Sequence, residues 1–132
     1  MAVTNQALPG GYQLLNYRVD RQISRGGFSI VYRAFDETGA PVAIKEYLPS
    51  SLVLRTEGDI VRASSAENLT SFRYGMKCFF EEGRALARLS HPNVARVFDI
   101  DTEPDFGSWM AMELVQGEDL GAVMHRAGRL PL

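Results

Sequence analysis

The stretch Val42-Ala43-Ile44-Lys45 constrains the fold most, because three apolar residues run directly into a lysine. Two of the three are β-branched, and a short apolar run of this kind predicts a buried strand. A lysine at the end of a buried strand is poorly tolerated unless an anion meets its ammonium group. We therefore expect the chain to bring a carboxylate, a phosphate or both to Lys45.

The other expected strands are apolar, β-branched and aromatic segments separated by turn residues. The strands cover residues 17–23, 28–35, 41–47, 94–100 and 108–115, with a short extra hairpin at about 52–62. One long helix is expected over residues 72–89, between the third and fourth strands. This order predicts an α+β fold, a five-stranded antiparallel sheet with the helix on one face.

Helical spacing supplies the first candidate partner for Lys45. Apolar residues recur at steps of three and four from Phe72 to Leu89, which predicts an amphipathic helix. Glu82 shares the apolar face of that helix, whereas Glu81 is rotated away by about 100°. Glu82 is therefore the expected carboxylate partner, and a solvated Glu82 with a bent side chain is the alternative.

Two boundaries are less sharply defined. Residues 1–16 are expected to form an irregular lead-in. Before the helix, Ser64 and Glu67 have the spacing of a capping box, while Asn68, Thr70 and Ser71 are rival N-caps.

A glycine pair between the first two strands supplies the second candidate partner. Gly26 and Gly27 have no Cβ, so their backbone N–H groups can approach a phosphate closely. An ordinary hairpin turn is the alternative interpretation of the same pair.

Composition bounds the class of protein. A length of 132 residues suits one domain, and a net charge of −2 gives no general attraction to nucleic acid or anionic lipid. We therefore expect no nucleic-acid partner and no membrane contact. The only cysteine, Cys78, excludes an internal disulfide and is expected to be a small core residue in a cytoplasmic protein. No signal peptide, no run near the roughly 18 apolar residues of a membrane span and no metal-ligand cluster is recognisable.

Five segments form a recognisable order. They are the run from Ile23 to Tyr32 around the glycine pair, the Val42 to Lys45 stretch, Glu82 ten residues before Pro92, the run His91-Pro92-Asn93-Val94, and the run Met110 to Gly117. In this order and spacing they resemble the N-terminal lobe of a eukaryotic-type protein kinase. The run Lys45-Glu46-Tyr47-Leu48-Pro49 and the hairpin after it resemble bacterial Ser/Thr kinases in particular.

The resemblance implies an ATP site with residues in distinct roles. Lys45 would contact the α- and β-phosphates of ATP and pair with Glu82. Gly26, Gly27, Phe28 and Ser29 would cover the phosphates, and Ile23, Val31 and Ala43 would surround the adenine ring. Met112 would close the back of the slot. The backbone of Glu113 and Val115 would make the polar contacts to the adenine, and Asp119 would contact the ribose. Ser24 and Ser29 stand where the family's loop has its first and third glycines, so Ser24 adds a side chain where the strand bends.

The same resemblance implies a division of the chain and an activity. Residues 1–16 would be a lead-in, 17–115 the N-terminal lobe, and 116–132 the hinge exit and the start of a truncated C-terminal lobe. A full-length parent kinase would transfer the γ-phosphoryl group of ATP to protein Ser or Thr, using Mg²⁺. The catalytic His-Arg-Asp and metal-binding Asp-Phe-Gly that follow the hinge are absent, so the chain alone is expected to be inactive.

Two further expectations concern partners. Without a C-terminal lobe the docking surface is open, and we expect either self-association or disorder of residues 116–132. The alternative function is a stand-alone lobe or pseudokinase-like module that binds a protein partner without catalysis.

Overall fold

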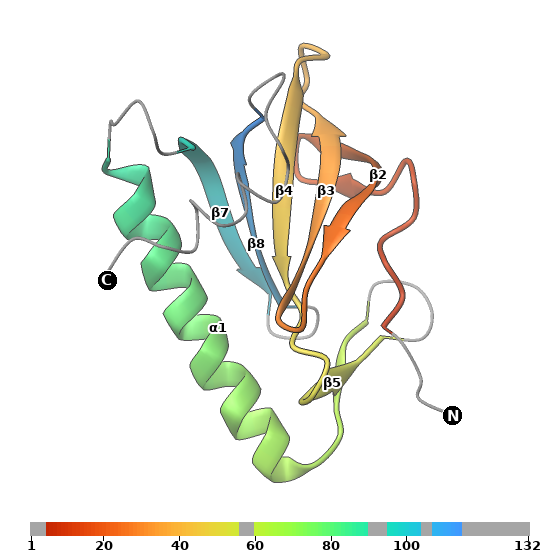
Figure 1. The fold of residues 1–132 in the computed structure, drawn as a ribbon, viewed down its shortest axis with the longest axis vertical. Coiled ribbons are helices and arrows are strands. Elements are labelled where there is room, and N and C mark those ends of the chain that lie inside the picture. The colour runs from red at the N-terminus through yellow and green to blue at the C-terminus, as the bar shows by residue number, and fades with distance from the viewer. Residues whose placement is uncertain (1–4, 56–59, 90–94, 104–106, 115–132) are drawn as a thin grey trace.

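The computed structural model describes residues 5–55, 60–89, 95–103 and 107–114, and shows one long helix crossing one face of a curled antiparallel sheet (Figure 1). The elements are β1 (Gln13–Leu14), β2 (Tyr17–Arg25), β3 (Ser29–Phe35), β4 (Pro41–Tyr47), β5 (Val53–Leu54), β6 (Arg62–Ala63), α1 (Ala66–Ala87), β7 (Val97–Glu103) and β8 (Gly107–Glu113). Within those ranges no helix combines the length and the apolar character that a membrane crossing requires.

The main sheet has six strands rather than the five expected, in the order β1-β2-β3-β4-β8-β7. The additional strand is β1, which lies in the segment predicted to be an irregular lead-in. Its two residues, Gln13 and Leu14, pair with Arg18 and Tyr17 across a turn at Leu15. Leu15 has a φ of 51°, a left-handed conformation that few non-glycine residues adopt. A strand of two residues carries no alternation, so the sequence pattern could not reveal it.

Strand β4 lies between β3 and β8, and its apolar run is buried as expected. Directly paired residues share a face of an antiparallel sheet, and Lys45 pairs with Val31 on one side and Met110 on the other. These three side chains therefore lie on the face that α1 covers. Glu46 and its partner Trp109 lie on the opposite face.

The outer face of the sheet is also buried. Trp109 is 2% exposed and meets the ring of Tyr17 edge-on, with ring centroids 5.9 Å apart. Val19 and Leu14, both nearly inaccessible, belong to the same core. Because both faces are covered, β4 is a fixed platform for the residues that it carries.

Helix α1 begins at Ala66, within the range of starts that the rival N-caps left open. Its N-cap is Ser65, whose Oγ accepts a hydrogen bond from the backbone N–H of Asn68 at 3.0 Å. The predicted capping box of Ser64 and Glu67 is therefore wrong by one residue. The buried face of α1 consists of Phe72, Met76, Phe79, Gly83 and Leu86, which keep the predicted spacing of three and four. Leu89 lies past the end of α1 and is 43% exposed.

Two glycines let α1 approach the sheet closely. A Cβ at Gly75 would collide with the hydroxyl of Tyr47, and a Cβ at Gly83 would collide with Ile100. The Tyr47 ring is held in place because it stacks on Phe72, with centroids 5.4 Å apart, and its hydroxyl donates to the Phe72 carbonyl oxygen at 3.2 Å. The helix is thereby seated directly on β4.

The extra hairpin is present as β5 and β6, a separate two-stranded sheet that pairs Val53 with Ala63 and Leu54 with Arg62. The turn expected at Glu57 and Gly58 lies outside the described residues. Arg55 follows β5, and its guanidinium is completely buried against β4. This burial was not predicted.

Arg55 forms a bidentate ion pair with Glu46, which is 2% exposed. Arg55 Nη1 donates to Glu46 Oε2 at 2.6 Å, and Nη2 donates to Oε1 at 2.9 Å. The hydroxyl of Tyr32 donates to Glu46 Oε1 at 2.7 Å and accepts from Arg55 Nη2 at 3.2 Å. Burial opposes the charge on Arg55, but the hydrogen bonds and charge of Glu46 outweigh it and raise the pKa of the guanidinium.

The N-terminal segment closes over this cluster. Arg55 Nε donates to the Gln6 carbonyl oxygen at 2.9 Å, and the Arg55 N–H donates to Asn5 Oδ1 at 2.6 Å. The Leu8 N–H donates to the Tyr32 hydroxyl at 3.0 Å. Residues 5–8 are irregular in conformation, yet they are bonded to the hairpin and to β3, and in Figure 1 this segment lies beside β5.

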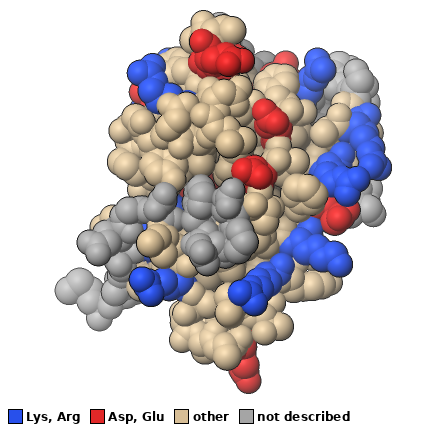
Figure 2. Space-filling view, turned by 180° about the vertical axis from the view of Figure 1, so that it is seen from behind, with Lys and Arg blue, Asp and Glu red and all other residues tan. Residues whose placement is uncertain are grey.

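Basic side chains gather along the side of the molecule where α1 runs (Figure 2). Helix α1 and its C-cap carry Arg73, Lys77, Arg84 and Arg88, all exposed. The net charge of −2 is thus unevenly distributed over the surface.

Candidate functional site

A cavity of about 220 Å³ lies where the turn between β2 and β3, strand β4 and helix α1 meet. Its lining residues are Phe28, Ser29, Lys45, Tyr47, Gly75, Cys78, Phe79 and Glu82. The structure therefore brings together four residues that the sequence singled out from three separate segments: Phe28, Ser29, Lys45 and Glu82.

Lys45 and Glu82 face this cavity in a partly dehydrated setting. Burial lowers the pKa of Lys45, and the charge of Glu82 opposes that shift. Burial raises the pKa of Glu82, and the charge of Lys45 opposes that shift. Glu81, by contrast, is exposed, so the rotation inferred from helical spacing places the correct one of the two carboxylates at the cavity.

The two side chains do not form a closed ion pair. The ion pairs between described residues do not include Lys45 with Glu82. Glu82 Oε1 is inaccessible to solvent and has no hydrogen-bond partner. Glu82 Oε1 can therefore still accept a hydrogen bond, and the Lys45 ammonium can still donate one.

The glycine turn over the cavity is exposed at its tip, and a backbone hydrogen bond closes its base. The Gly26 N–H donates to the Ser29 carbonyl oxygen at 2.8 Å. Phe28 at the tip is 72% exposed, whereas Ser29 is 6% exposed. A Cβ at Gly27 would meet nothing within 4 Å, so packing does not require glycine there.

The residues expected around an adenine ring extend the same face of the sheet. Val31, Ala43 and Met112 are at most 3% exposed, and Ala43 pairs directly with Met112. Ile23 and Ser24 are half-buried at the end of β2, where Ser24 pairs with Val31. Ser24 and Val31 lie in one cross-strand row with Lys45, and Ala43 and Met112 form the next row on the same face.

The far end of that row is only partly described. Glu113 is exposed at the end of β8, and its N–H donates to the Arg96 carbonyl oxygen at 2.7 Å. This N–H is therefore already used within the fold. Val115 and Asp119 lie outside the described residues, as does the run from His91 to Val94.

Sequence reasoning missed four lining residues: Tyr47, Gly75, Cys78 and Phe79. Tyr47 is two residues after Lys45, so the strand period of two places both on one face. Gly75, Cys78 and Phe79 precede Glu82 by seven, four and three residues, which are the helical spacings of one face. Cys78 was expected in the core, but it is half-buried and lines the cavity.

The tripeptide Asp-Phe-Gly occurs once in the sequence, at residues 105–107. Gly107 opens β8 and pairs with Glu103, so the tripeptide belongs to the connection between β7 and β8, ahead of the hinge segment. It therefore does not follow the hinge, where the resemblance places a metal-binding aspartate. Among the described residues, no group of three or more His, Cys, Asp or Glu side chains is arranged to hold a metal ion.

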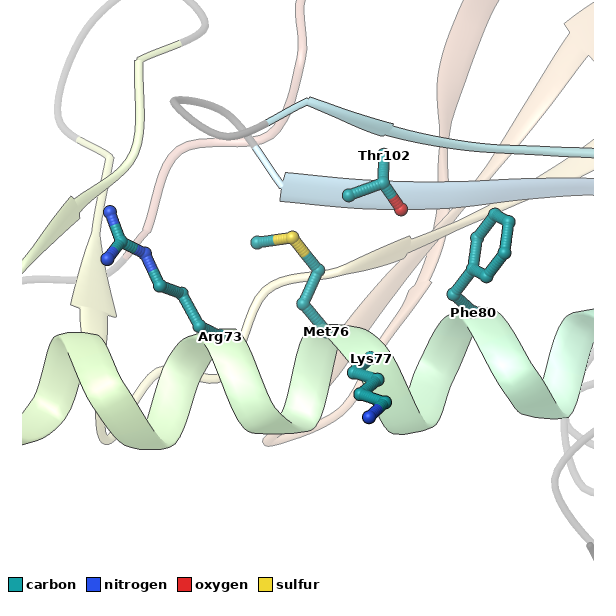
Figure 3. A pocket seen from close by; sticks show the side chains of 5 residues that line it. All are labelled: Arg73, Met76, Lys77, Phe80 and Thr102. Carbon is teal, nitrogen blue, oxygen red and sulfur yellow. The ribbon is translucent and has the colours of Figure 1, made fainter.

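A second cavity, of about 270 Å³, lies between α1 and β7 and is lined by Arg73, Met76, Lys77, Phe80 and Thr102. Figure 3 shows Met76 and Phe80 pointing from α1 toward the strands, while Lys77 turns away from them. This cavity shares none of its lining residues with the first.

Comparison with known proteins finds no protein-family model that matches the chain, but it does find similar proteins. Its sequence is 36% identical over 121 residues to serine/threonine-protein kinase PknA of Mycobacterium tuberculosis, covering 88% of this chain and 24% of PknA. The chain therefore spans about a quarter of the length of that relative.

Two solved structures share the fold. The apo form of PpkA-294 superposes with a TM-score of 0.79 and 32% sequence identity, covering 91% of this chain and 43% of that one. The kinase domain of Mycobacterium tuberculosis PknI gives a TM-score of 0.57 and 26% identity, covering 96% of this chain and 43% of that one. With its curled antiparallel sheet, its single described helix and its sequence, the chain has the fold of the N-terminal lobe of a eukaryotic-type protein kinase and is similar to bacterial serine/threonine protein kinases.

Proposed function

We propose that this lobe binds ATP as part of a bacterial serine/threonine protein kinase. The observation that carries the proposal is the cavity shared by Lys45, Glu82 and the tip of the glycine turn. Dehydration destabilises the charged forms of both Lys45 and Glu82. A bound polyanion would relieve Lys45, because an anion near a lysine favours its charged form.

In this proposal each residue of the site has one task. Lys45 binds the α- and β-phosphates of ATP, and Glu82 orients the Lys45 ammonium. Gly26, Gly27, Phe28 and Ser29 cover the phosphates, with Ser24 at the bend of β2. Ile23, Val31 and Ala43 hold the adenine ring in an apolar slot that Met112 closes, as ligand pockets commonly do. The backbone of Glu113 and Val115 and the side chain of Asp119 complete the site.

The proposed division of the chain follows from these tasks. Residues 17–115 form the ATP-binding lobe with its extra hairpin at about 52–62, residues 1–16 form the lead-in, and residues 116–132 lead toward a C-terminal lobe. The full-length protein transfers the γ-phosphoryl group of ATP to Ser or Thr of a protein substrate, and Mg²⁺ supplies charge neutralisation for that transfer. The catalytic base and the metal ligands belong to the C-terminal lobe, so the 132-residue chain binds nucleotide without turnover.

Replacing Lys45 by methionine tests the proposal. Lys45→Met keeps an unbranched apolar stem but removes the terminal ammonium group and its charge, so we expect at least tenfold weaker binding of an ATP analogue. Isothermal titration with adenylyl imidodiphosphate and Mg²⁺ measures the dissociation constant, and circular dichroism checks that the fold is unchanged.

Lys77→Met is the matched control, because Lys77 is exposed on α1 and lines the other cavity. It should bind nucleotide like the wild type. Equal affinities for the wild type and Lys45→Met would remove Lys45 from the nucleotide site.

A further inference from the structure

The segment from Glu46 to Arg55 forms a closed ring, which we call the brace. The chain closes one side of the ring and the bidentate Glu46–Arg55 pair closes the other, with N–O distances of 2.6 and 2.9 Å. Both side chains are at most 2% exposed. Within the ring, the Pro49 carbonyl oxygen accepts from the N–H groups of Leu52 and Val53, each at 3.1 Å, so the first turn of the brace is tight.

The outer side of this turn holds the tip of the glycine turn. The Leu48 N–H donates to the Phe28 carbonyl oxygen at 2.8 Å, and the Ser50 N–H donates to the Gly27 carbonyl oxygen at 3.0 Å. Ser50 Oγ lies 3.2 Å from the same Gly27 oxygen. The two residues at the tip are thus bonded to the brace, not only to the strands β2 and β3 that they connect.

The brace is also bonded to the start of the helix. The Ser64 N–H, one residue before the N-cap, donates to the Leu52 carbonyl oxygen at 3.1 Å. Both walls of the Lys45 cavity, the glycine turn and α1, are therefore tied to the segment that Arg55 closes.

The electrostatics of the pair explain why Arg55 can act as a fixed point. A buried ion pair is rigid when every donor and acceptor is satisfied, and it becomes strongly unfavourable when one partner is lost. The Arg55 guanidinium donates to Glu46 on β4, to Tyr32 on β3 and to the Gln6 carbonyl oxygen in the N-terminal segment. The backbone N–H of Arg55 donates to Asn5 Oδ1. These hydrogen bonds fix the position of the guanidinium and of its partner Glu46, which is adjacent to Lys45 in β4.

We propose that Arg55 is a positioning residue for the nucleotide site: its pair with Glu46 closes the brace, and the closed brace holds the Gly27 and Phe28 carbonyl groups over the Lys45 cavity. The inference rests on the proposed function in assigning that cavity to the phosphates of ATP. It assigns a role in that site to a residue that does not contact the cavity.

The test separates local holding from general stability. In the double variant Glu46→Leu/Arg55→Met both charges are removed together, so no unpaired buried charge remains. Hydrogen exchange followed by NMR compares the amides of Leu48 and Ser50 with those of the central strand β8. We expect the two brace amides to lose at least tenfold protection relative to the β8 amides. If Arg55 contributes only global stability, protection falls equally at all of these amides or does not change, and the proposal is overturned.

Two further variants control the comparison. Arg62→Met removes an exposed arginine from the same hairpin and should leave the Leu48 and Ser50 amides protected. Arg55→Lys keeps the charge but lacks the planar fork that makes two parallel hydrogen bonds, so it should give an intermediate loss even if the double variant folds poorly. Wild-type protection in Arg55→Lys would contradict the role of the bidentate pair.

A nucleotide titration completes the test. With adenylyl imidodiphosphate and Mg²⁺, the double variant should bind at least fivefold more weakly than Arg62→Met. Equal binding by the two would overturn the positioning role. If the wild-type chain itself binds no nucleotide, the proposed function and the nucleotide part of this inference both fail, while the exchange experiment still decides whether Arg55 holds the glycine turn.

Discussion

At the scale of single residues, the site combines two partly buried charged groups, Lys45 and Glu82, that influence each other's pKa without forming an ion pair. Glu82 retains an orphaned carboxylate oxygen, and burial disfavours the charged forms of both Glu82 and Lys45. Functional sites commonly hold groups in this way, at the expense of stability. The arrangement has a consequence for the dependence of stability on pH.

Lys45→Met should make the stability of the protein more sensitive to pH through Glu82. The variant removes the charge that opposes the raised pKa of Glu82, so the folded state binds the Glu82 proton more tightly than the unfolded state does. That extra stability is fully present below the ordinary glutamate pKa of 4.5 and is lost as the pH rises through the raised pKa of the folded state. We therefore expect the melting temperature of Lys45→Met, relative to wild type, to decline by a few degrees from pH 5 to pH 8.

Thermal unfolding followed by circular dichroism at both pH values measures this difference. Lys77→Met should show a constant difference from wild type, since its ammonium is exposed. A constant difference for Lys45→Met as well would mean that Lys45 does not influence the titration of Glu82.

At the scale of elements, the close packing of α1 against β4 depends on Gly75, which has no side chain. The Tyr47 ring is stacked on Phe72 and tilted against Phe79, with centroids 5.4 and 5.6 Å apart, and it fills the space above Gly75. The ring cannot retreat without breaking these contacts. A methyl group at Gly75 would therefore push α1 away from the strand that carries Lys45.

Gly75→Ala should destabilise the protein although alanine favours a helix over glycine by about 1 kcal/mol. Overpacking a tight contact costs about 1–3 kcal/mol, so we expect a net loss of about 1 kcal/mol in the free energy of unfolding. In the Tyr47→Phe background the loss should be smaller, because the hydroxyl is the atom that the new Cβ would meet first.

Urea unfolding of the four proteins in this double-mutant cycle measures the coupling between the two positions. Gly83→Ala is a useful comparison, since its new methyl group would meet the flexible ends of Ile100 and Met110. Its effect should be closer to zero. Additive effects of Gly75→Ala and Tyr47→Phe would contradict the contact.

The sequence predicted features set by nearby residues better than features set by residues far apart in the chain. Helical spacing alone placed Glu82 rather than Glu81 at the cavity. The helix start was displaced because Ser64 and Ser65 are equivalent in the local pattern, and only the bond to Asn68 distinguishes them. The burial of Arg55 was missed for another reason: the N-terminal residues that close over it are 49 and 50 residues away, contacts that no local pattern encodes.

At the scale of the whole molecule, the described surface exposes several large apolar side chains. They are Leu15, Phe28, Ile60, Tyr74, Leu89 and Phe98, each at least 43% accessible. Phe28 extends from the glycine turn, and Leu89 follows the end of α1. In the proposed full-length kinase, a second lobe would face the cavity side of this surface.

The isolated chain should self-associate through its exposed apolar surface. Exposed apolar patches of sufficient size bring protein surfaces together. Light scattering coupled to size-exclusion chromatography should give a mean mass that rises above that of the monomer as the concentration is increased. A constant monomer mass up to high micromolar concentration would show that the exposed side chains are too scattered to associate.

The outer face of the sheet also carries a built-in reporter. Trp109 is the only tryptophan in the sequence, and its indole is sealed beside Tyr17 on the side of β8 away from the cavity. Its fluorescence should therefore be blue-shifted in the native protein and move to longer wavelength on unfolding. Every variant considered above leaves Trp109 in place, so the folding of each can be followed by intrinsic emission, without a label and without added ligand.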